Sequence, residues 1–266
     1  QDRPLVEAGG KGLFVKEIEE ALLEGEADIA VHSMKDLPAE QPEGLAIPAV
    51  LPREEPFDVF LARDGMPFDK LPENARIGTS SVRRAAQALR LRPDLKIVPL
   101  RGNVETRLLK LARGEADAII LARAGLIRLN LSLPDSEVLS GEDWLPALCQ
   151  GIIAIETRED DSLVREIVAE INDPPTHIAA ACERGFLAAL DGSCRTPLAG
   201  LADVEHGTVR FRGQVLSLDG SQSWRVTRIF AHAELSQETA IAQSYAAGEG
   251  AAQEIRQTAG KDFPNF

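Results

Sequence analysis

The sequence predicts an α/β protein with two α/β lobes around a cleft plus a small C-terminal α+β domain. An internal sequence repeat indicates the two lobes: residues 21–28 (ALLEGEAD) lead into an apolar run at 29–31, and residues 110–117 (KLARGEAD) lead into another at 118–121. In each copy an amphipathic helix ends at a glycine, and a turn opens a short strand that is apolar on both faces. Such strands are typical of parallel sheets covered by helices, whose ligands bind beyond the carboxyl ends of the strands.

The last third of the chain has a different pattern, which predicts the α+β domain. Its expected elements are a helix from 174 to about 190, a tight loop at 191–197, strands at 208–218 and 224–233, and a helix from about 237 to 258. The two strands flank Asp219-Gly220-Ser221, which is a hairpin signal. We therefore expect lobe 1 at 1–52 and 152–170, an arginine-rich lobe 2 at 53–151, and the C-terminal domain at 171–266.

Positive charge is concentrated in one stretch of an acidic chain. Between Arg76 and Arg128 there are twelve Lys and Arg against four Asp and Glu, a local charge of +8, whereas the whole chain carries −13. Most of these cations are arginines, whose planar fork matches carboxylate or phosphate better than lysine does. The stretch therefore predicts an anion site. Some of its cations are instead expected to solvate helix faces: Arg90, Arg92, Lys110 and Arg113.

Nucleic acid is a poor candidate for that anion. The 76–128 stretch has no Phe, Trp or Tyr to stack on bases, and the net charge of −13 would repel a polyanion that extended beyond the stretch. A small polycarboxylate or phosphate fits better. The pattern also fits a non-catalytic two-lobed small-anion-binding protein, which would need no reactive thiol.

Composition limits the remaining classes of protein. No run of roughly 18 or more apolar residues suggests a membrane span. The three cysteines and four histidines are scattered, so we expect reduced thiols, a cytoplasmic location and no metal site. The chain opens close to a helix without Met or a signal peptide, and we expect an N-terminal portion to be missing.

The three cysteines differ in their surroundings. Cys182 lies among alanines on the predicted 174–190 helix and is interpreted as a core residue. Cys149 is interpreted as structural. Cys194 sits beside Arg195 in the 191–197 loop, where a cation favours the thiolate. From the residues alone, a reactive thiol and an ordinary loop cysteine are equally open at position 194.

Polar and cationic side chains follow the predicted strands. Arg83 and Arg84 lie in the first turn of a helix expected to run to about Leu91, where the helix dipole disfavours cations. Because the two arginines are placed where the helix dipole disfavours them, we expect them to have a functional role. The residues just before them are good N-caps at a helix start, where free amides attract anions: Thr79, Ser80 and Ser81. Other strand-end segments are His32-Ser33-Met34-Lys35-Asp36, Arg101-Gly102-Asn103 with Arg107 one helical turn on, and Ala122-Arg123-Ala124-Gly125 with Arg128.

Five motifs occur together in one order: Gly9-Gly10-Lys11-Gly12-Leu13-Phe14, His32-Ser33-Met34-Lys35-Asp36, Gly78-Thr79-Ser80-Ser81-Val82-Arg83-Arg84, Arg101-Gly102-Asn103 with Thr106-Arg107, and Leu190-Asp191-Gly192-Ser193-Cys194. With them the chain resembles the porphobilinogen deaminase (hydroxymethylbilane synthase) family along essentially its whole length. Each motif alone is short, whereas five in sequence are highly specific. The resemblance implies two periplasmic-binding-protein-like lobes and a C-terminal domain that carries the cofactor cysteine.

The resemblance implies a transferase of tetrapyrrole and heme biosynthesis. In this family a dipyrromethane cofactor, built from two substrate molecules, is bound through a thioether, and the matching position is Cys194. Four porphobilinogens are condensed head to tail with loss of ammonia, and 1-hydroxymethylbilane is released by hydrolysis while the cofactor stays bound. The implied partners are porphobilinogen and its polypyrrole intermediates, for a cytoplasmic monomer that binds neither nucleic acid nor membrane.

The implied site residues agree with that chemistry. Each porphobilinogen carries an acetate and a propionate, so the growing chain needs cationic partners. A carboxylate would stabilise the cationic azafulvene that forms when ammonia leaves, and Asp36 is the implied catalytic residue. Alternatively, Asp36 only caps the turn before Pro38 or pairs with Lys35. The implied cofactor ligands are Cys194, Lys35, Asp36, Thr79, Ser80, Ser81, Arg83 and Arg84, and the implied substrate ligands are Lys11, Arg101, Arg107, Arg128 and Gln150.

Three features depart from the family pattern. Members normally begin with a strand and helix that supply further Arg and Ser contacts, and this part is absent here. Glu7 stands where many members have a Lys, which would weaken anion binding if that loop closes over the site. Cys149-Gln150-Gly151 replaces the more usual Gly-Gln-Gly, and a side chain at 149 is unproblematic unless the turn needs a positive φ.

Overall fold

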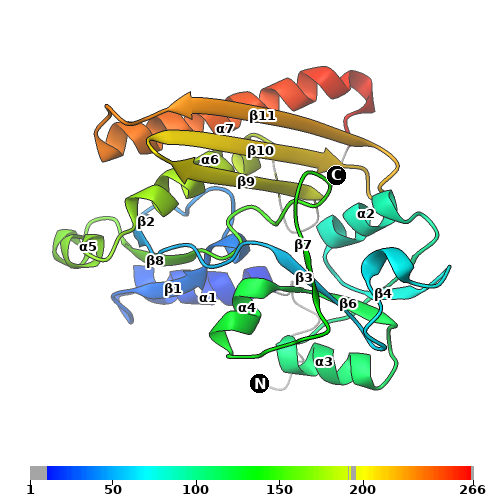
Figure 1. The fold of residues 1–266 in the computed structure, drawn as a ribbon. Helices are drawn as coiled ribbons and strands as arrows, with labels where there is room; N and C mark the ends of the chain where they lie inside the picture. Colours follow the sequence, from blue (N-terminus) through cyan, green and yellow to red (C-terminus); the bar gives the residue numbers. More distant parts are fainter. Residues whose placement is uncertain (1–10, 191, 193–195, 265–266) are drawn as a thin grey trace.

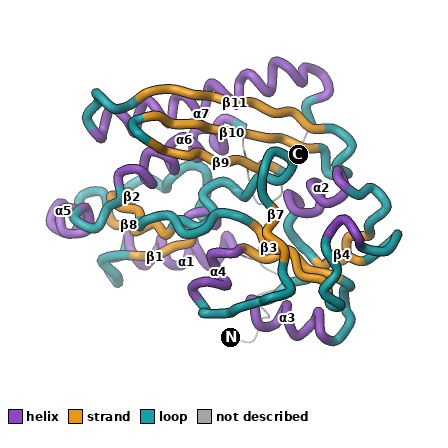
Figure 2. The backbone as a smooth tube through the Cα atoms, viewed as in Figure 1, coloured by secondary structure: helices purple, strands orange, loops and turns teal. Residues whose placement is uncertain are grey.

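The computed structural model describes residues 11–190, 192 and 196–264, with side chains from residue 15 onward. These residues form a first sheet of order β1-β8-β2, a second sheet of order β5-β4-β6-β3-β7 and a C-terminal sheet of order β11-β10-β9. The C-terminal sheet lies across the other two, which stand side by side beneath it in the views of Figures 1 and 2. The predicted fold class, two α/β lobes plus a small α+β domain, is confirmed.

The first sheet is antiparallel throughout, with β8 in the middle. Helices pack on both of its faces: Leu22 of α1 shares a core with Ala30 and Leu45, and Val168 of α5 packs with Ile155 on the other side. The expectation of a parallel partner for the 29–31 strand is wrong: β1 pairs antiparallel with β8, and the exposure of Ile29 and Val31 shows that this strand is not covered on both faces. The elements are α1 (Lys11–Leu23), β1 (Ala30–Ser33), η1 (Met34–Asp36), β2 (Leu45–Val50), β8 (Ile153–Arg158) and α5 (Ser162–Ala169).

The second sheet is mixed. Strand β4 runs parallel to β5 and β6, as the apolar 118–121 run predicts, whereas β3 is antiparallel to both β6 and β7. Isoleucines fill the centre: Ile77, Ile119 and Ile120 are almost fully buried. The elements are β3 (Asp58–Ala62), η2 (Phe68–Lys70), β4 (Arg76–Gly78), α2 (Val82–Leu91), β5 (Lys96–Val98), α3 (Val104–Ala112), β6 (Ala118–Ala122), α4 (Arg123–Arg128) and β7 (Glu137–Leu139).

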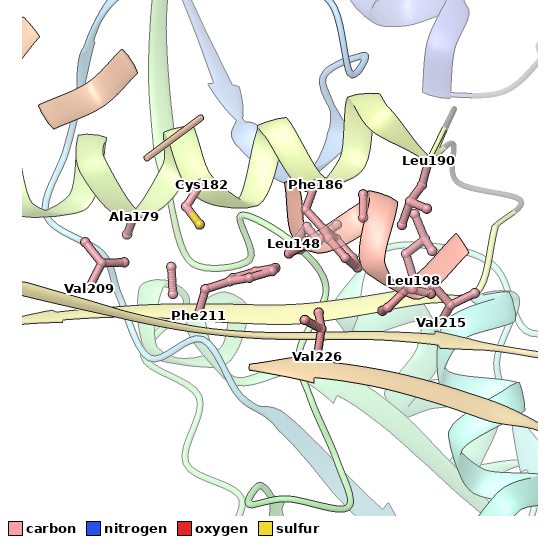
Figure 3. Packing of buried hydrophobic residues seen from close by; sticks show 14 of the residues in the cluster. Leu148, Ala179, Cys182, Phe186, Leu190, Leu198, Val209, Phe211, Val215 and Val226 are labelled. Carbon is pink, nitrogen blue, oxygen red and sulfur yellow. The ribbon is translucent and has the colours of Figure 1, made fainter. Parts of the chain in front are cut away.

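The two long helices of the C-terminal domain, α6 and α7, pack on one face of its sheet. Phe186 of α6 meets Phe211 of β10 edge to face, with ring centroids 5.1 Å apart, and Cys182 lies in the same core (Figure 3). The predicted hairpin is confirmed, since β10 and β11 pair from Thr208 opposite Ala231 to the turn. The elements are α6 (Pro174–Ala189), β9 (Leu198–Glu205), β10 (Thr208–Leu216), β11 (Ser223–Ala231), α7 (Gln237–Ala259) and η3 (Gly260–Asp262).

Two crossing segments, 51–57 and 148–152, connect the first and second sheets. They are bonded to each other by Glu54 N–H donating to the Gly151 carbonyl at 3.1 Å. Glu183 of α6 closes this junction: its fully buried carboxylate accepts Arg53 Nη1 at 2.6 Å and Nη2 at 3.3 Å. The same carboxylate accepts the backbone N–H groups of Cys149 and Ala202. We call Glu183 with these partners the Glu183 cluster; it joins the two crossing segments to α6 and β9.

Within the part of the chain that the structure describes, no helix has both the length and the apolar character that crossing a membrane requires.

Candidate active site

The loop from β4 into α2 is held by its own hydroxyl groups. Thr79 Oγ1 accepts the Ser81 N–H at 3.1 Å, and Ser81 Oγ caps α2 by accepting the Arg84 N–H at 3.4 Å. Ser80 Oγ accepts the Leu100 N–H at 3.2 Å, which ties this loop to the end of β5. Three predicted ligand residues therefore also fix the start of α2 and the direction of the two arginines that follow.

Arg83 and Arg84 point into the protein, where they are only 4% and 6% exposed. Their common partner is Asp58, the first residue of β3, whose side chain is fully buried. Asp58 Oδ1 accepts Arg84 Nη2 at 2.7 Å and Nε at 3.2 Å, and Oδ2 lies 2.8 Å from Arg83 Nη1. Arg83 also donates to the Leu145 carbonyl at 2.9 Å. The arginines are thus already oriented by the protein.

Two further side chains complete this group. Trp144 Nε1 donates to Asp58 Oδ2 at 2.9 Å, and Gln150 Nε2 donates to Oδ1 at 3.0 Å. We call Asp58 with these four partners the Asp58 cluster. Burial alone would raise the pKa of Asp58, but the charges and hydrogen bonds of Arg83 and Arg84 outweigh it and hold that pKa far below its usual range. Burial also lowers the pKa of Arg83.

Gln150 links the Asp58 cluster to the first sheet. Its Oε1 accepts Lys35 Nζ at 3.1 Å, and its Nε2 donates both to Asp58 and to the Pro56 carbonyl at 2.6 Å. Lys35 and Asp36 form the end of η1 directly after β1, and both are half-buried. The structure therefore brings Lys35 of the His32–Asp36 motif close to the arginines of the 78–84 motif.

The remaining predicted cations occupy different surroundings. Arg107 of α3 donates from Nε to the Gly102 carbonyl at 2.9 Å, and burial followed by the charge of Arg84 lowers its pKa, which places it near the arginine pair. Arg101 and Arg128 are exposed, and Arg128 Nη2 donates to the Gly151 carbonyl at 2.8 Å. Lys11 begins α1, and its side chain lies outside the description.

Cys149 and Cys182, the two cysteines that the structure describes, are both buried, as expected for structural residues. Cys182 is fully buried in the C-terminal core, as predicted, and burial raises the pKa of its thiol. Burial followed by the charge of Glu183 raises the pKa of Cys149 to about 12, so this thiol is inert at neutral pH. Cys194 and Glu7 lie outside the described residues.

The residues beside that loop are described and pack close to the site. Leu190 and Leu198, on either side of it, share a core with Leu148, and the Gly200 N–H donates to the Pro146 carbonyl at 3.0 Å. Pro146 directly follows Leu145, whose carbonyl holds Arg83. The start of β9 is therefore bonded to the segment that contacts the arginines.

Sequence reasoning missed Asp58, Trp144 and Glu183. The signal for Asp58 was a charge at the head of an otherwise apolar strand, Asp58–Ala62. Glu183 had a similar signal, a charge beside Cys182 on an apolar helix. Among the described residues, no group of three or more His, Cys, Asp or Glu is placed to hold a metal ion.

Two family models match the chain. "Porphobilinogen deaminase, dipyromethane cofactor binding domain" matches residues 1–166, and "Porphobilinogen deaminase, C-terminal domain" matches residues 177–257. The first match includes every predicted site residue except Cys194, which the second includes.

Curated relatives agree with the family models. A porphobilinogen deaminase of Nitrobacter hamburgensis is 50% identical over 263 residues, covering 99% of this chain and 80% of the relative. One of Syntrophobacter fumaroxidans is 52% identical over 227 residues, covering 85% of this chain and 74% of the relative. A solved structure, a putative methionine-binding lipoprotein of Bacillus subtilis, aligns with a TM-score of 0.39 and 18% identity over 59% of this chain and 74% of that chain, a similarity too weak to support an inference. From the family models and the curated relatives, the chain belongs to the porphobilinogen deaminase family.

Proposed function

We propose that this chain joins four porphobilinogen molecules head to tail on a covalent dipyrromethane primer, with loss of one ammonia for each, and releases 1-hydroxymethylbilane by hydrolysis. The observation that carries the proposal is the excess of buried positive charge around Arg83 and Arg84, in a chain of this family. Substrate and product both carry several carboxylates, and guanidinium groups bind carboxylates through paired, charge-assisted hydrogen bonds.

The residues around Arg83 fit a bound dipyrromethane, which also carries carboxylates. Asp58, Arg83 and Arg84 together leave one positive charge, and the buried Arg83 Nε–H has no hydrogen-bond partner among the described residues. An unsatisfied buried donor costs about 1–3 kcal/mol, which a ligand carboxylate would offset. When bound, the cofactor supplies the pyrrole position to which the first porphobilinogen is joined. The residues that would hold it are Cys194, through a thioether, with Lys35, Asp36, Thr79, Ser80, Ser81, Arg83 and Arg84.

Asp36 is proposed as the catalytic residue. It is half-buried at the end of η1, so a ligand can reach it while bulk water screens it less than at an open surface. Its carboxylate would stabilise the cation that porphobilinogen becomes when ammonia leaves, and would accept the pyrrole N–H. The same carboxylate would take up and return a proton during bond formation.

Four cationic residues are proposed to bind the carboxylates of substrate and the lengthening product, and Gln150, which was predicted with them, is proposed to act indirectly. Arg107 is supported by its position near Arg84, and Arg101 and Arg128 by their exposure. Gln150 is almost fully buried, its Nε2 hydrogens bind Asp58 and Pro56, and its Oε1 accepts from Lys35, so we propose that it positions Lys35 and does not itself bind a carboxylate. The proposal for Lys11 rests on its sequence motif alone.

We also propose that the chain divides into domains at 1–52 with 152–170, 53–151 and 171–266, and that it is a cytoplasmic monomer.

The test is the intact mass of the denatured protein beside a Cys194→Ser control. The proposal expects an added mass of two linked pyrrole units that the control lacks. A thiol count in denaturant should then find two reactive cysteines, Cys149 and Cys182, because the third is blocked. Incubation with porphobilinogen should add further pyrrole units one at a time.

A bare polypeptide mass with three reactive thiols, in a protein that still binds porphobilinogen, would instead favour a non-catalytic small-anion-binding protein. An added mass that persists in Cys194→Ser would place the attachment at another residue and contradict the assignment of Cys194.

A further inference from the structure

A carboxylate that the proposed chemistry does not use lies at the centre of the site. Asp58 is fully buried and accepts hydrogen bonds or ion pairs from four side chains, those of Arg83, Arg84, Trp144 and Gln150. A buried carboxylate needs such partners, because an unpaired one would cost several kcal/mol. The question is whether Asp58 serves only the fold or also the reaction.

The backbone holds Asp58 in place on both sides. It lies opposite Ala122 of β6 and opposite Leu139 of β7, within three neighbouring antiparallel strands. A residue in the middle of a sheet cannot shift without loss of hydrogen bonds on two ladders. Asp58 is therefore a fixed acceptor, and the long side chains that reach it take their positions from it.

The contacts of Asp58 join two separate parts of the site. Arg83 and Arg84 reach it from α2, while Gln150 reaches it from the segment that crosses to the first sheet and also binds Lys35. We propose that Asp58 is a positioning residue: it holds Arg83, Arg84 and, through Gln150, Lys35 in the arrangement that receives the carboxylates of primer and substrate. This inference rests on the proposed function.

The charge of Asp58 matters as much as its place. Two guanidinium groups buried side by side repel each other, and their repulsion would drive the side chains apart or towards solvent. One carboxylate between them offsets this repulsion by attracting both groups and leaves a single excess positive charge, which one ligand carboxylate can neutralise. Asp58 would thus set both where a ligand carboxylate binds and how tightly it is held.

The test is Asp58→Asn, which keeps the shape of the side chain and removes its charge. Primer loading by intact mass, the melting temperature, and kcat and KM for porphobilinogen are measured at a temperature where the protein is folded. Positioning predicts a kcat/KM at least about 30-fold lower, mostly through KM, and a smaller primer-loaded fraction. Asp58→Glu, which keeps the charge, should recover part of this loss.

A purely structural role would lower the melting temperature and leave the folded, loaded enzyme unchanged. A kcat/KM within twofold of the unmodified protein in folded Asp58→Asn would therefore overturn the proposal. The matched control is Asp117→Asn, because Asp117, directly before β6, pairs at 2.9 Å with Arg76 at the start of β4, the end of that strand opposite to the 79–84 loop. Its kcat/KM should not change, and an equal fall in both variants would also overturn the proposal.

If Asp58→Asn does not fold, Trp144→Phe decides the matter. It removes one N–H donor from Asp58 Oδ2 and keeps every charge, so we expect a kcat/KM several-fold lower through a raised KM. An unchanged KM would overturn the proposal. The unmodified protein is measured alongside: if it holds no primer and has no turnover, the proposed function and this inference both fail, whereas active protein with unaffected variants contradicts only the role of Asp58.

Discussion

Two buried carboxylates in this protein each collect several N–H donors, and they differ in how their charges balance. In the Glu183 cluster one anion meets one cation, Arg53, and two backbone N–H groups complete its partners. In the Asp58 cluster one anion meets two cations, Arg83 and Arg84. The first cluster is neutral and closed. The second keeps one positive charge, and its Arg83 Nε–H has no hydrogen-bond partner among the described residues.

From this difference we infer that the Glu183 cluster holds the fold, and we propose that the Asp58 cluster binds a ligand. A balanced buried pair repays its desolvation only through good geometry, and the Glu183 cluster uses that geometry to join the crossing segments to α6 and β9. An unbalanced cluster keeps an uncompensated cation, which is unfavourable until an anion binds. The comparison therefore predicts that changes in the Glu183 cluster act on stability, whereas changes near the Asp58 cluster act on binding and turnover.

The largest effect on turnover is expected at a third carboxylate, that of Asp36. Asp36 is half-buried, beside Lys35. Asp36→Asn keeps the shape and removes the charge that would stabilise the substrate cation, so we expect kcat to fall by roughly 10²- to 10⁴-fold. The protein should stay folded and keep its primer, which intact mass and a melting curve check. Normal turnover in this variant would rule out Asp36 as the catalytic residue.

The Glu183 cluster should show the largest loss of stability. Glu183→Gln leaves the Arg53 guanidinium buried without a counter-charge, which costs about 3–5 kcal/mol in such pairs and should lower the melting temperature by roughly 5–15 °C. In the fraction that remains folded, kcat/KM should stay within a factor of about two.

The control for this variant is Glu254→Gln, which removes the carboxylate of a half-exposed pair with Arg228. A surface pair of this kind contributes about 0–1 kcal/mol, so the melting temperature should barely change. If Glu183→Gln lost turnover while its stability was unchanged, the distinction between the two clusters would be wrong.

Removal of Arg83 should give the opposite result. Arg83→Leu leaves Asp58 paired with Arg84, so the Asp58 cluster becomes neutral and loses its unpartnered N–H. We therefore expect a stability loss smaller than that of Glu183→Gln, together with a kcat/KM or primer loading about 10- to 100-fold lower, since hydrogen bonds between charged groups contribute about 1.5–3 kcal/mol. Melting curves and kinetics on the same preparation check both parts. Normal elongation by Arg83→Leu would remove the main support for a carboxylate site at α2.

Local signals predicted much of the fold and part of the site. Helices α2 and α7 and the β10–β11 hairpin follow from capping residues, helical spacing and a turn sequence, all of which act within a few residues. The same signals gave Thr79, Ser80 and Ser81 as candidate caps of α2, and the structure shows that Ser81 is the cap. The pairing of β1 with β8 could not be predicted this way, because the partners are 120 to 126 residues apart and the direction of β8 depends on how the chain crosses between the sheets.

The site was harder to predict where it depends on distant partners. Two arginines in the first turn of a helix indicate an anion site, but nothing near them in the sequence shows that both turn inward to Asp58, 25 and 26 residues upstream. Nor does the sequence show that Gln150 reaches across to Lys35. Charge patterns indicate where cations gather, whereas their division between internal and ligand-facing roles is set by tertiary contacts.

The smallest expected effect concerns Cys149, where the family pattern usually has glycine. Its φ is 60°, so the turn does need the left-handed conformation, which costs a residue with a side chain about 1–2 kcal/mol. Cys149→Gly relieves that strain but loses a buried side chain and gains chain entropy on unfolding, so the free energy of unfolding should change by less than about 1 kcal/mol. Cys149→Val keeps the strain and adds a β-branch, and should lose more than about 2 kcal/mol. Denaturant unfolding measures both variants. If Cys149→Gly and Cys149→Val lost the same free energy of unfolding, packing around the side chain, rather than the backbone, would decide which residue this position accepts.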